Sequence, residues 1–145
     1  INAMTAVDEV LIPIQCEYYA LEGVGQLLSN IGMIREHLNH NLHISGILLT
    51  MYDARTRLAA DVADEVRGQF GQVVLNNVIP RSVKVSEAPG YGQTVIDYDP
   101  GSRGALAYFD AAKELATRGD YQPHPTTGPI GVSPEVYNQL DSEED

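Results

Sequence analysis

The sequence predicts an α/β fold in which a parallel sheet is covered by helices on both faces. Short, continuously apolar segments alternate with longer segments whose apolar residues recur at helical spacing. An order of strand, helix, strand, helix, strand requires right-handed crossovers, which make the strands parallel. We expect about three strands and three to four helices within residues 1–119.

The three predicted strands are apolar runs without the alternation of a half-exposed strand. The first is 8–15 (DEVLIPIQ). The second, 43–52 (HISGILLTMY), contains Gly46, which permits a close backbone approach. The third, 72–80 (QVVLNNVIP), ends at Pro80, because proline has no N–H to continue a ladder.

The predicted helices each carry one apolar stripe. They cover 19–38, 54–70 and about 102–118, where apolar residues recur three or four positions apart. In 54–70, the stripe consists of Leu58, Val62, Val66 and Phe70.

The helical periodicity stops after Gly119. Residues 120–145 are rich in Pro, Gly and Ser and hold six acids but no Lys or Arg, which is typical of a disordered tail. We therefore divide the chain into 1–119 and an acidic, disordered tail, 120–145. Because 1–119 supply few strands for a sheet with covered edges, we interpret them as the carboxyl-terminal part of a larger domain.

The net charge of −11 belongs largely to this tail, since residues 1–119 hold fourteen acids against nine bases, or −5. An acidic body argues against nucleic-acid binding through a general positive field, but it permits a small local set of cations. The single cysteine, Cys16, fits a reducing compartment. With no signal or membrane segment in view, we expect a cytoplasmic protein.

Basic residues lie just after two predicted strands. Arg55 follows the second strand, and Arg81 and Lys84 follow the third, in a loop restrained by Pro80 and an APGYG turn. In parallel α/β sheets, ligands bind outside the carboxyl ends of the strands. These cations are therefore candidates for an anion-binding rim.

Several chemistries lack local support. The sequence has no G-x-x-x-x-G-K-[ST] phosphate loop and no G-x-S-x-G elbow, and we predict no catalytic residue in this chain. The three histidines of 37–43 fit a polar helix end better than a metal site. Cys16 fits a small buried apolar residue. Glu17 and Glu22 fit acid–base chemistry and a helix N-terminus about equally.

Three stretches carry a specific resemblance: VLIPIQCEYYALEGVGQLL, ISGILLTMYDARTRLAADVADEV and VIPRSVKVSEAPGYGQTVIDYDPGSRGALAY. Together they resemble the carboxyl-terminal half of the ParA/Soj chromosome-partitioning ATPases, deviant-Walker-A proteins of the MinD/ParA superfamily. The resemblance covers about 1–118 and implies a partial P-loop-type sheet. It also implies a complete protein that binds ATP and Mg²⁺, forms a homodimer with ATP and binds non-specific DNA at the nucleoid. A ParB-type partner would stimulate hydrolysis, and no membrane is involved.

The resemblance also implies site residues. Pro80 and Ser82 occupy positions that hold the adenine end of the nucleotide, although many relatives have Asn at the position of Ser82. Arg55 and Lys84 fall on two DNA-contacting basic positions. The second position is often Arg, and Lys keeps the charge without the bidentate fork, which suits phosphate contact. The family's phosphate loop, magnesium ligands and water-positioning aspartate lie upstream of Ile1, so we expect this chain alone to be inactive.

Three alternatives remain. A non-catalytic, truncated interaction fragment would expose a sheet edge and depend on a partner. A MinD-like membrane-positioning ATPase would need a basic amphipathic helix at its carboxyl terminus, where this chain is acidic. An iron–sulfur reductase would need several cluster-ligating cysteines, and the sequence has one.

Overall fold

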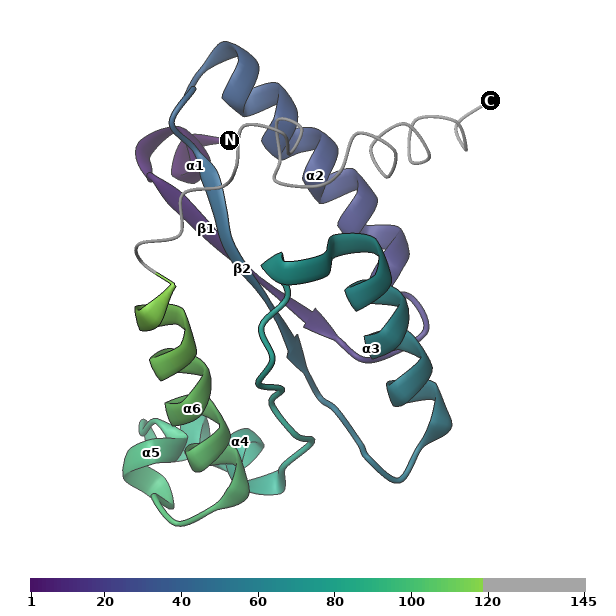
Figure 1. The fold of residues 1–145 in the computed structure, drawn as a ribbon. Helices are drawn as coiled ribbons and strands as arrows, with labels where there is room; N and C mark the ends of the chain where they lie inside the picture. Colours follow the sequence, from purple (N-terminus) through teal and green to yellow (C-terminus); the bar gives the residue numbers. More distant parts are fainter. Residues whose placement is uncertain (119–145) are drawn as a thin grey trace.

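A computed structural model describes residues 1–118 of the chain (Figure 1). The tail expected at 120–145 lies outside the described residues. The elements, in order, are α1 (Asn2–Ala6), β1 (Glu9–Gln15), α2 (Ala20–His37), β2 (His43–Thr50), α3 (Arg57–Phe70), η1 (Gly71–Val73), α4 (Val83–Glu87), η2 (Ala88–Tyr91), α5 (Val95–Tyr98) and α6 (Arg103–Thr117).

The sheet consists of β1 and β2, which pair in parallel from Glu9 opposite His43 to Gln15 opposite Thr50. The helix α2 makes the crossover between them. This arrangement confirms the predicted α/β class with a parallel sheet.

Helices cover both faces of the sheet, as predicted. On one face, α2 and α3 pack against side chains of β1 and β2, and the centre of this core includes Ile31, Ile47 and Val66, each with 0% exposure. On the other face, α6 packs through Ala111 against Leu48 of β2. Figure 1 shows α2 and α3 on one side of the strands and α6 on the other.

The third predicted strand is not a regular strand in the structure. Residues 72–80 run beside β2 but meet it in two isolated bridges, Ile47 with Val74 and Tyr52 with Pro80. The N–H of Leu75 donates to the carbonyl of Ile47, and that of Ile79 donates to the carbonyl of Leu49, both at 2.8 Å.

The spacing of these hydrogen bonds explains the irregularity. From Leu75 to Ile79 the segment advances four residues, while their acceptors on β2, Ile47 and Leu49, are only two residues apart. A continuous ladder needs equal steps on both strands, so it cannot form here. The intervening N–H groups of Asn76 and Asn77 donate to the Glu114 carboxylate on α6, at 2.7 and 2.9 Å. A side chain thus takes the place of a strand partner.

Helix number also differs from the expectation of three to four. The three long helices, α2, α3 and α6, lie where the periodicity predicts them, and Thr56 and Ser102 cap the last two by accepting the N–H of Ala59 and Ala105. The described residues contain three further helices of four or five residues, α1, α4 and α5. Such short helices carry too few residues to show a periodic stripe.

The close backbone approach expected at Gly46 is replaced in the structure by close packing of side chains. A Cβ atom placed on Gly46 would collide with the Leu75 side chain, and Leu11 and Leu115 lie at 3.4 and 3.6 Å. Gly46 therefore lets segment 72–80 and α6 pack closely on the sheet.

Candidate functional site

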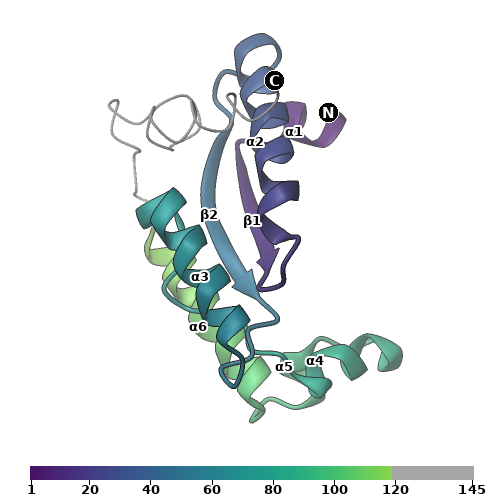
Figure 2. The same ribbon diagram turned by 90° about the vertical axis from the view of Figure 1, so that its right-hand side faces the viewer.

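The loops after β1, β2 and segment 72–80 meet at the carboxyl edge of the sheet. Figure 2 shows α4 and α5 beyond this edge, past the arrowheads of β1 and β2. This is the rim on which the sequence predicts an anion-binding site.

Backbone hydrogen bonds join the second and third of these loops. The N–H of Tyr52 donates to Ile79 at 3.0 Å, and the N–H of Arg81 donates to Tyr52 at 2.9 Å. Met51, directly after β2, has a left-handed backbone (φ 55°), which is uncommon for a residue with a side chain. The turn at Met51 and the two hydrogen bonds place the predicted cation loops side by side.

Arg55 is held in one orientation by Asp53. Its Nε and Nη2 atoms donate to the two carboxylate oxygens of Asp53 at 2.9 and 2.8 Å, and its backbone N–H donates to Oδ1 at 3.1 Å. The Arg55 side chain is nevertheless 87% exposed. Hydrogen bonds from Arg55, with the positive charges of Arg55 and Arg81, lower the pKa of Asp53 to about 2.

Lys84 lies in a second polar cluster on α4. Its Nζ atom is 3.6 Å from Glu87 Oε2 and 5.5 Å from the centre of the Tyr98 ring. The hydroxyl of Tyr98 donates to the same carboxylate oxygen at 3.1 Å, and its ring stacks on Tyr91 at 5.1 Å. Burial, followed by the hydrogen bond and charge of Glu87, raises the pKa of Tyr98.

Pro80 and Ser82 lie between these two clusters. Pro80 forms the bridge to Tyr52, and Ser82 is the residue before the first turn of α4. Gly104 lets the start of α6 approach this turn, because a Cβ atom there would lie 2.6 Å from Val85 and 3.2 Å from the Ser82 hydroxyl. The four predicted binding residues therefore lie in two adjacent parts of the chain, the loop after β2 and the stretch that leads from Pro80 into α4.

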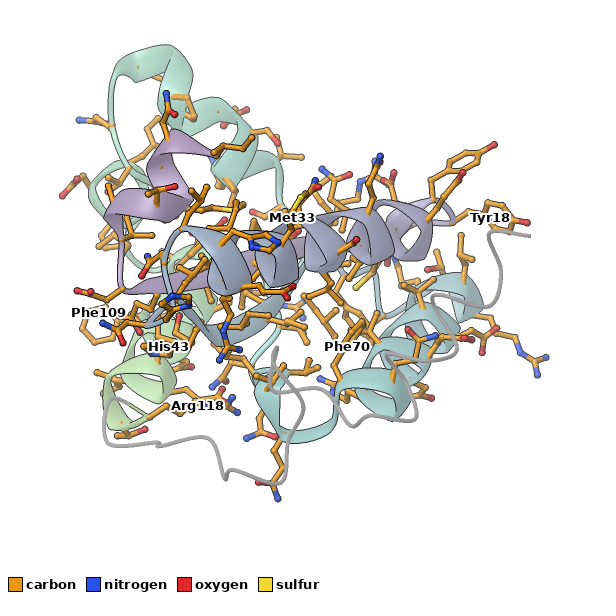
Figure 3. All side chains as sticks on the ribbon, turned by 90° about the horizontal axis from the view of Figure 1, so that it is seen from above. Tyr18, Met33, His43, Phe70, Phe109 and Arg118 are labelled. Atoms are coloured by element: carbon orange, nitrogen blue, oxygen red, sulfur yellow. The ribbon has the colours of Figure 1, made fainter. Side chains whose placement is uncertain are left out.

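The loop after β1 contributes aromatic and acidic side chains. Tyr18 and Tyr19 are 75% and 77% exposed, and their rings meet edge to face at 5.2 Å. Glu17 and Tyr19 line a cavity of about 340 Å³ between β1 and the start of α2, and Glu22 lies in the first turn of α2. Figure 3 shows Tyr18 at the opposite end of the molecule from His43 and Arg118.

The remaining candidates lie away from the rim or inside the core. His40 contacts the carbonyl of Arg35, and His43 lies 3.6 Å from Glu9 at the start of the sheet. Among residues 1–118, no three His, Cys, Asp or Glu side chains gather as metal ligands would. Cys16 is buried, and burial raises the pKa of its thiol, with Arg67 acting in the opposite direction.

The sequence reasoning missed the partners of the predicted cations. Asp53 lies two residues before Arg55, and Glu87 lies three residues after Lys84, so both pairs are visible as local spacing. The Tyr91–Tyr98 stack and the contact of Glu114 with Asn76 carry no such local signal.

No helix in the described part of the chain combines the length and the apolar character needed to cross a lipid bilayer.

Comparison with known proteins identifies similar sequences. A family model described as an AAA domain matches residues 1–44. The chain is 56% identical over 119 residues to the sporulation initiation inhibitor protein Soj of Bacillus subtilis, covering 82% of this chain and 47% of Soj. It is 49% identical over 118 residues to the chromosome partitioning protein ParA of Caulobacter vibrioides, covering 81% of this chain and 44% of ParA. The chain thus spans about half the length of the curated relatives it matches.

Solved structures share the fold. One is cobyrinic acid a,c-diamide synthase from Mycobacterium smegmatis with a bound ATP analog and magnesium, at a TM-score of 0.62 and 33% identity, covering 81% of this chain and 41% of that chain. Another is the cell division ATPase MinD of Pyrococcus furiosus, at a TM-score of 0.60 and 26% identity, covering 79% and 45%.

Proposed function

We propose that this chain, which spans about half the length of its Soj and ParA relatives, is the carboxyl-terminal part of a partitioning ATPase of the ParA/Soj family. The complete protein binds ATP with Mg²⁺, dimerises and binds DNA without sequence preference. A ParB-type partner stimulates its hydrolysis, and it works in the cytoplasm at the nucleoid.

One observation carries this proposal. The hydrogen bonds of Tyr52 with Ile79 and Arg81 bring the loops after β2 and segment 72–80 together. The first loop carries the Arg55 guanidinium, and the second leads into α4, which carries the Lys84 ammonium. Exposed cations at this edge suit the phosphate oxygens of nucleic acid.

We assign the phosphate contacts to Arg55 and Lys84. Their side chains are 87% and 48% exposed, so both can reach a ligand from solvent. Residues 1–119 carry a net charge of −5, and their nine basic residues form no long basic stripe in the sequence. A broad positive surface for DNA is therefore not expected. DNA binding therefore depends on a few specific cations, which contact the phosphate backbone and do not read the base sequence.

We assign the adenine end of the nucleotide to Pro80 and Ser82. The turn is restrained on one side by the bridge to Tyr52 and on the other by Gly104 at the start of α6. Phosphate cradling, magnesium binding and positioning of the attacking water act together in phosphoryl transfer. In this proposal they come from residues outside this chain, so the purified chain hydrolyses no ATP.

DNA binding by the complete protein tests the assignment. With Mg²⁺ and ATP present, Arg55→Ala and Lys84→Ala should each weaken binding evenly across duplex sequences and reduce the salt slope by about one. ATP binding should stay unchanged. Lys113→Ala is the matched control, since Lys113 lies over Phe109 on the half of α6 that packs near the start of β2.

Three results would count against the proposal. If both variants bind DNA normally, the cations are not phosphate contacts. If they lose ATP binding instead, the loops serve the nucleotide and the DNA surface lies elsewhere. A preference of the complete protein for lipid vesicles over DNA would favour a MinD-like role.

A further inference from the structure

The two cations assigned to DNA are already paired with carboxylates in the structure. Asp53 accepts two hydrogen bonds from the Arg55 guanidinium, and Glu87 lies 3.6 Å from the Lys84 ammonium. In each case the acid belongs to the same loop or helix as the cation. Any phosphate that binds here meets a cation whose charge is partly neutralised.

Only some of the basic residues have a carboxylate partner. All nine Lys and Arg residues lie within 1–118. Among the described residues, a carboxylate lies within 4.0 Å of four of them: Arg55, Arg57, Lys84 and Arg118. Both assigned DNA contacts are in this group, whereas Arg81, on the same rim, has no such partner there.

We propose that Asp53 and Glu87 compete with DNA phosphate for Arg55 and Lys84 and thereby keep the affinity of the rim for DNA low. This inference rests on the proposed function of the two cations. Weak contacts suit a protein that must release DNA, because each subunit then holds the backbone only loosely.

The two acids compete in different ways. Asp53 is fixed by the backbone N–H of Arg55 and is only 17% exposed, so it stays in place while a ligand approaches. It uses Nε and Nη2 of the guanidinium, which leaves the N–H groups of Nη1 for a phosphate. Asp53 therefore acts mainly through its charge, which repels the incoming anion.

Glu87 competes by pairing directly with the Lys84 ammonium, the group that would contact a phosphate. Its carboxylate is held by the hydroxyl of Tyr98, while the Lys84 stem places Nζ within reach of both the carboxylate and the Tyr98 ring. A phosphate must draw Lys84 away from this cluster. Lysine is a flexible point charge, so the exchange needs no change in the backbone.

Neutral, nearly isosteric variants test the proposal in the complete protein with Mg²⁺ and ATP. Asp53→Asn and Glu87→Gln remove one negative charge each but keep an acceptor oxygen for Arg55 N–H and Tyr98 O–H. Each should bind a fluorescent, random-sequence duplex about two- to fivefold more tightly, the range expected when an exposed ion pair is lost. The salt dependence should become steeper.

Glu36→Gln is the matched control. Glu36 is 75% exposed and lies in the last turn of α2, at the opposite end of the sheet, so it changes the net charge equally without touching the rim. Its DNA affinity should equal that of the parent protein.

Double variants separate local competition from a general charge effect. In a Lys84→Ala background, Glu87→Gln should no longer strengthen binding, and Arg55→Ala should likewise abolish the effect of Asp53→Asn. An increase that persists in these backgrounds would overturn the proposal, as would unchanged or weaker binding by both neutral variants. If Arg55→Ala and Lys84→Ala leave DNA binding intact, the proposed function itself fails, and this inference with it.

Discussion

Glu114 and Arg118, one turn apart on α6, together hold the backbone of segment 72–77. Arg118 Nη2 donates to Glu114 Oε1 at 2.7 Å, and the same guanidinium donates to the carbonyls of Gln72, Val73 and Val74 at 2.8 to 3.3 Å. Glu114 accepts the N–H groups of Asn76 and Asn77. The pair thus hydrogen-bonds backbone N–H and carbonyl groups that, in a regular strand, would pair with a neighbouring strand.

Removing the Glu114 carboxylate should destabilise the fold. Glu114→Ala leaves two backbone N–H groups without their acceptor and should cost about 1–3 kcal/mol in the free energy of unfolding. Urea denaturation followed by circular dichroism measures this. Glu36→Ala, an exposed change on α2, should cost little, and equal losses for the two variants would refute the role of Glu114.

The same carboxylate should make stability depend on pH. Burial opposes its ionisation, but hydrogen bonds from Asn76 and Asn77 and the charge of Arg118 together lower the pKa of Glu114 below 4.5. A lowered folded-state pKa contributes stability that is present above the unfolded value and is lost as pH falls through the folded value. The free energy of unfolding should therefore drop below about pH 4.5, and less so in Glu114→Gln.

Gly46 should not tolerate a side chain. Gly46→Ala forces its Cβ atom against Leu75, which is 1% exposed, and should destabilise the chain by about 1–3 kcal/mol. Gly68→Ala is the matched control, because nothing lies within 4 Å of the added Cβ atom on α3. That control should be stabilising, since alanine favours helix over glycine. If Gly46→Ala unfolds at a higher temperature than the parent chain, the close packing at Gly46 is disproved.

Asp53 should titrate at an unusually low pH because of Arg55. Carbon-13 NMR of the carboxyl group should give a midpoint of about 2, rising toward 3.8 in Arg55→Ala. The pair is therefore intact at neutral pH, and any stability it provides is lost only as pH falls from 3.8 through about 2. Arg57→Ala removes a neighbouring cation and should leave the midpoint in place; an unchanged midpoint in Arg55→Ala would contradict the pairing.

Cys16 should react slowly with disulfide reagents at neutral pH. It is 3% exposed, and burial raises the pKa of its thiol, so little thiolate is available. Absorbance during reaction with a chromogenic disulfide should show a slow phase that becomes fast in urea. Cys16→Ser/Ser29→Cys places a single thiol on the exposed face of α2 and should react rapidly when folded.

The sequence predicts the fold where local pattern and tertiary packing agree. Two apolar runs became β1 and β2, and the long periodic segments became α2, α3 and α6. Segment 72–80 was predicted wrongly as a strand, because the residue that diverts its backbone, Glu114, lies 37 and 38 positions from the N–H groups it accepts. No local window contains that contact.

The candidate site was predictable only in outline. Strand order placed Arg55 and Lys84 on one rim, but their acidic partners depend on side-chain geometry that periodicity does not report. The stacking of Tyr91 on Tyr98 likewise requires the turns at Gly92 and at the start of α5, where helices of four residues leave little trace in the pattern.

The irregular course of segment 72–77 also affects how the chain resists aggregation. Extended peptides add to a sheet by pairing with a row of free backbone groups, and such rows template intermolecular assembly. Here the amides of Asn76 and Asn77 are occupied by Glu114, and the carbonyls of 72–74 by Arg118. The Glu114 and Arg118 side chains thus keep these backbone groups from pairing with another chain. A mutation that removes either side chain would expose backbone groups prone to self-association.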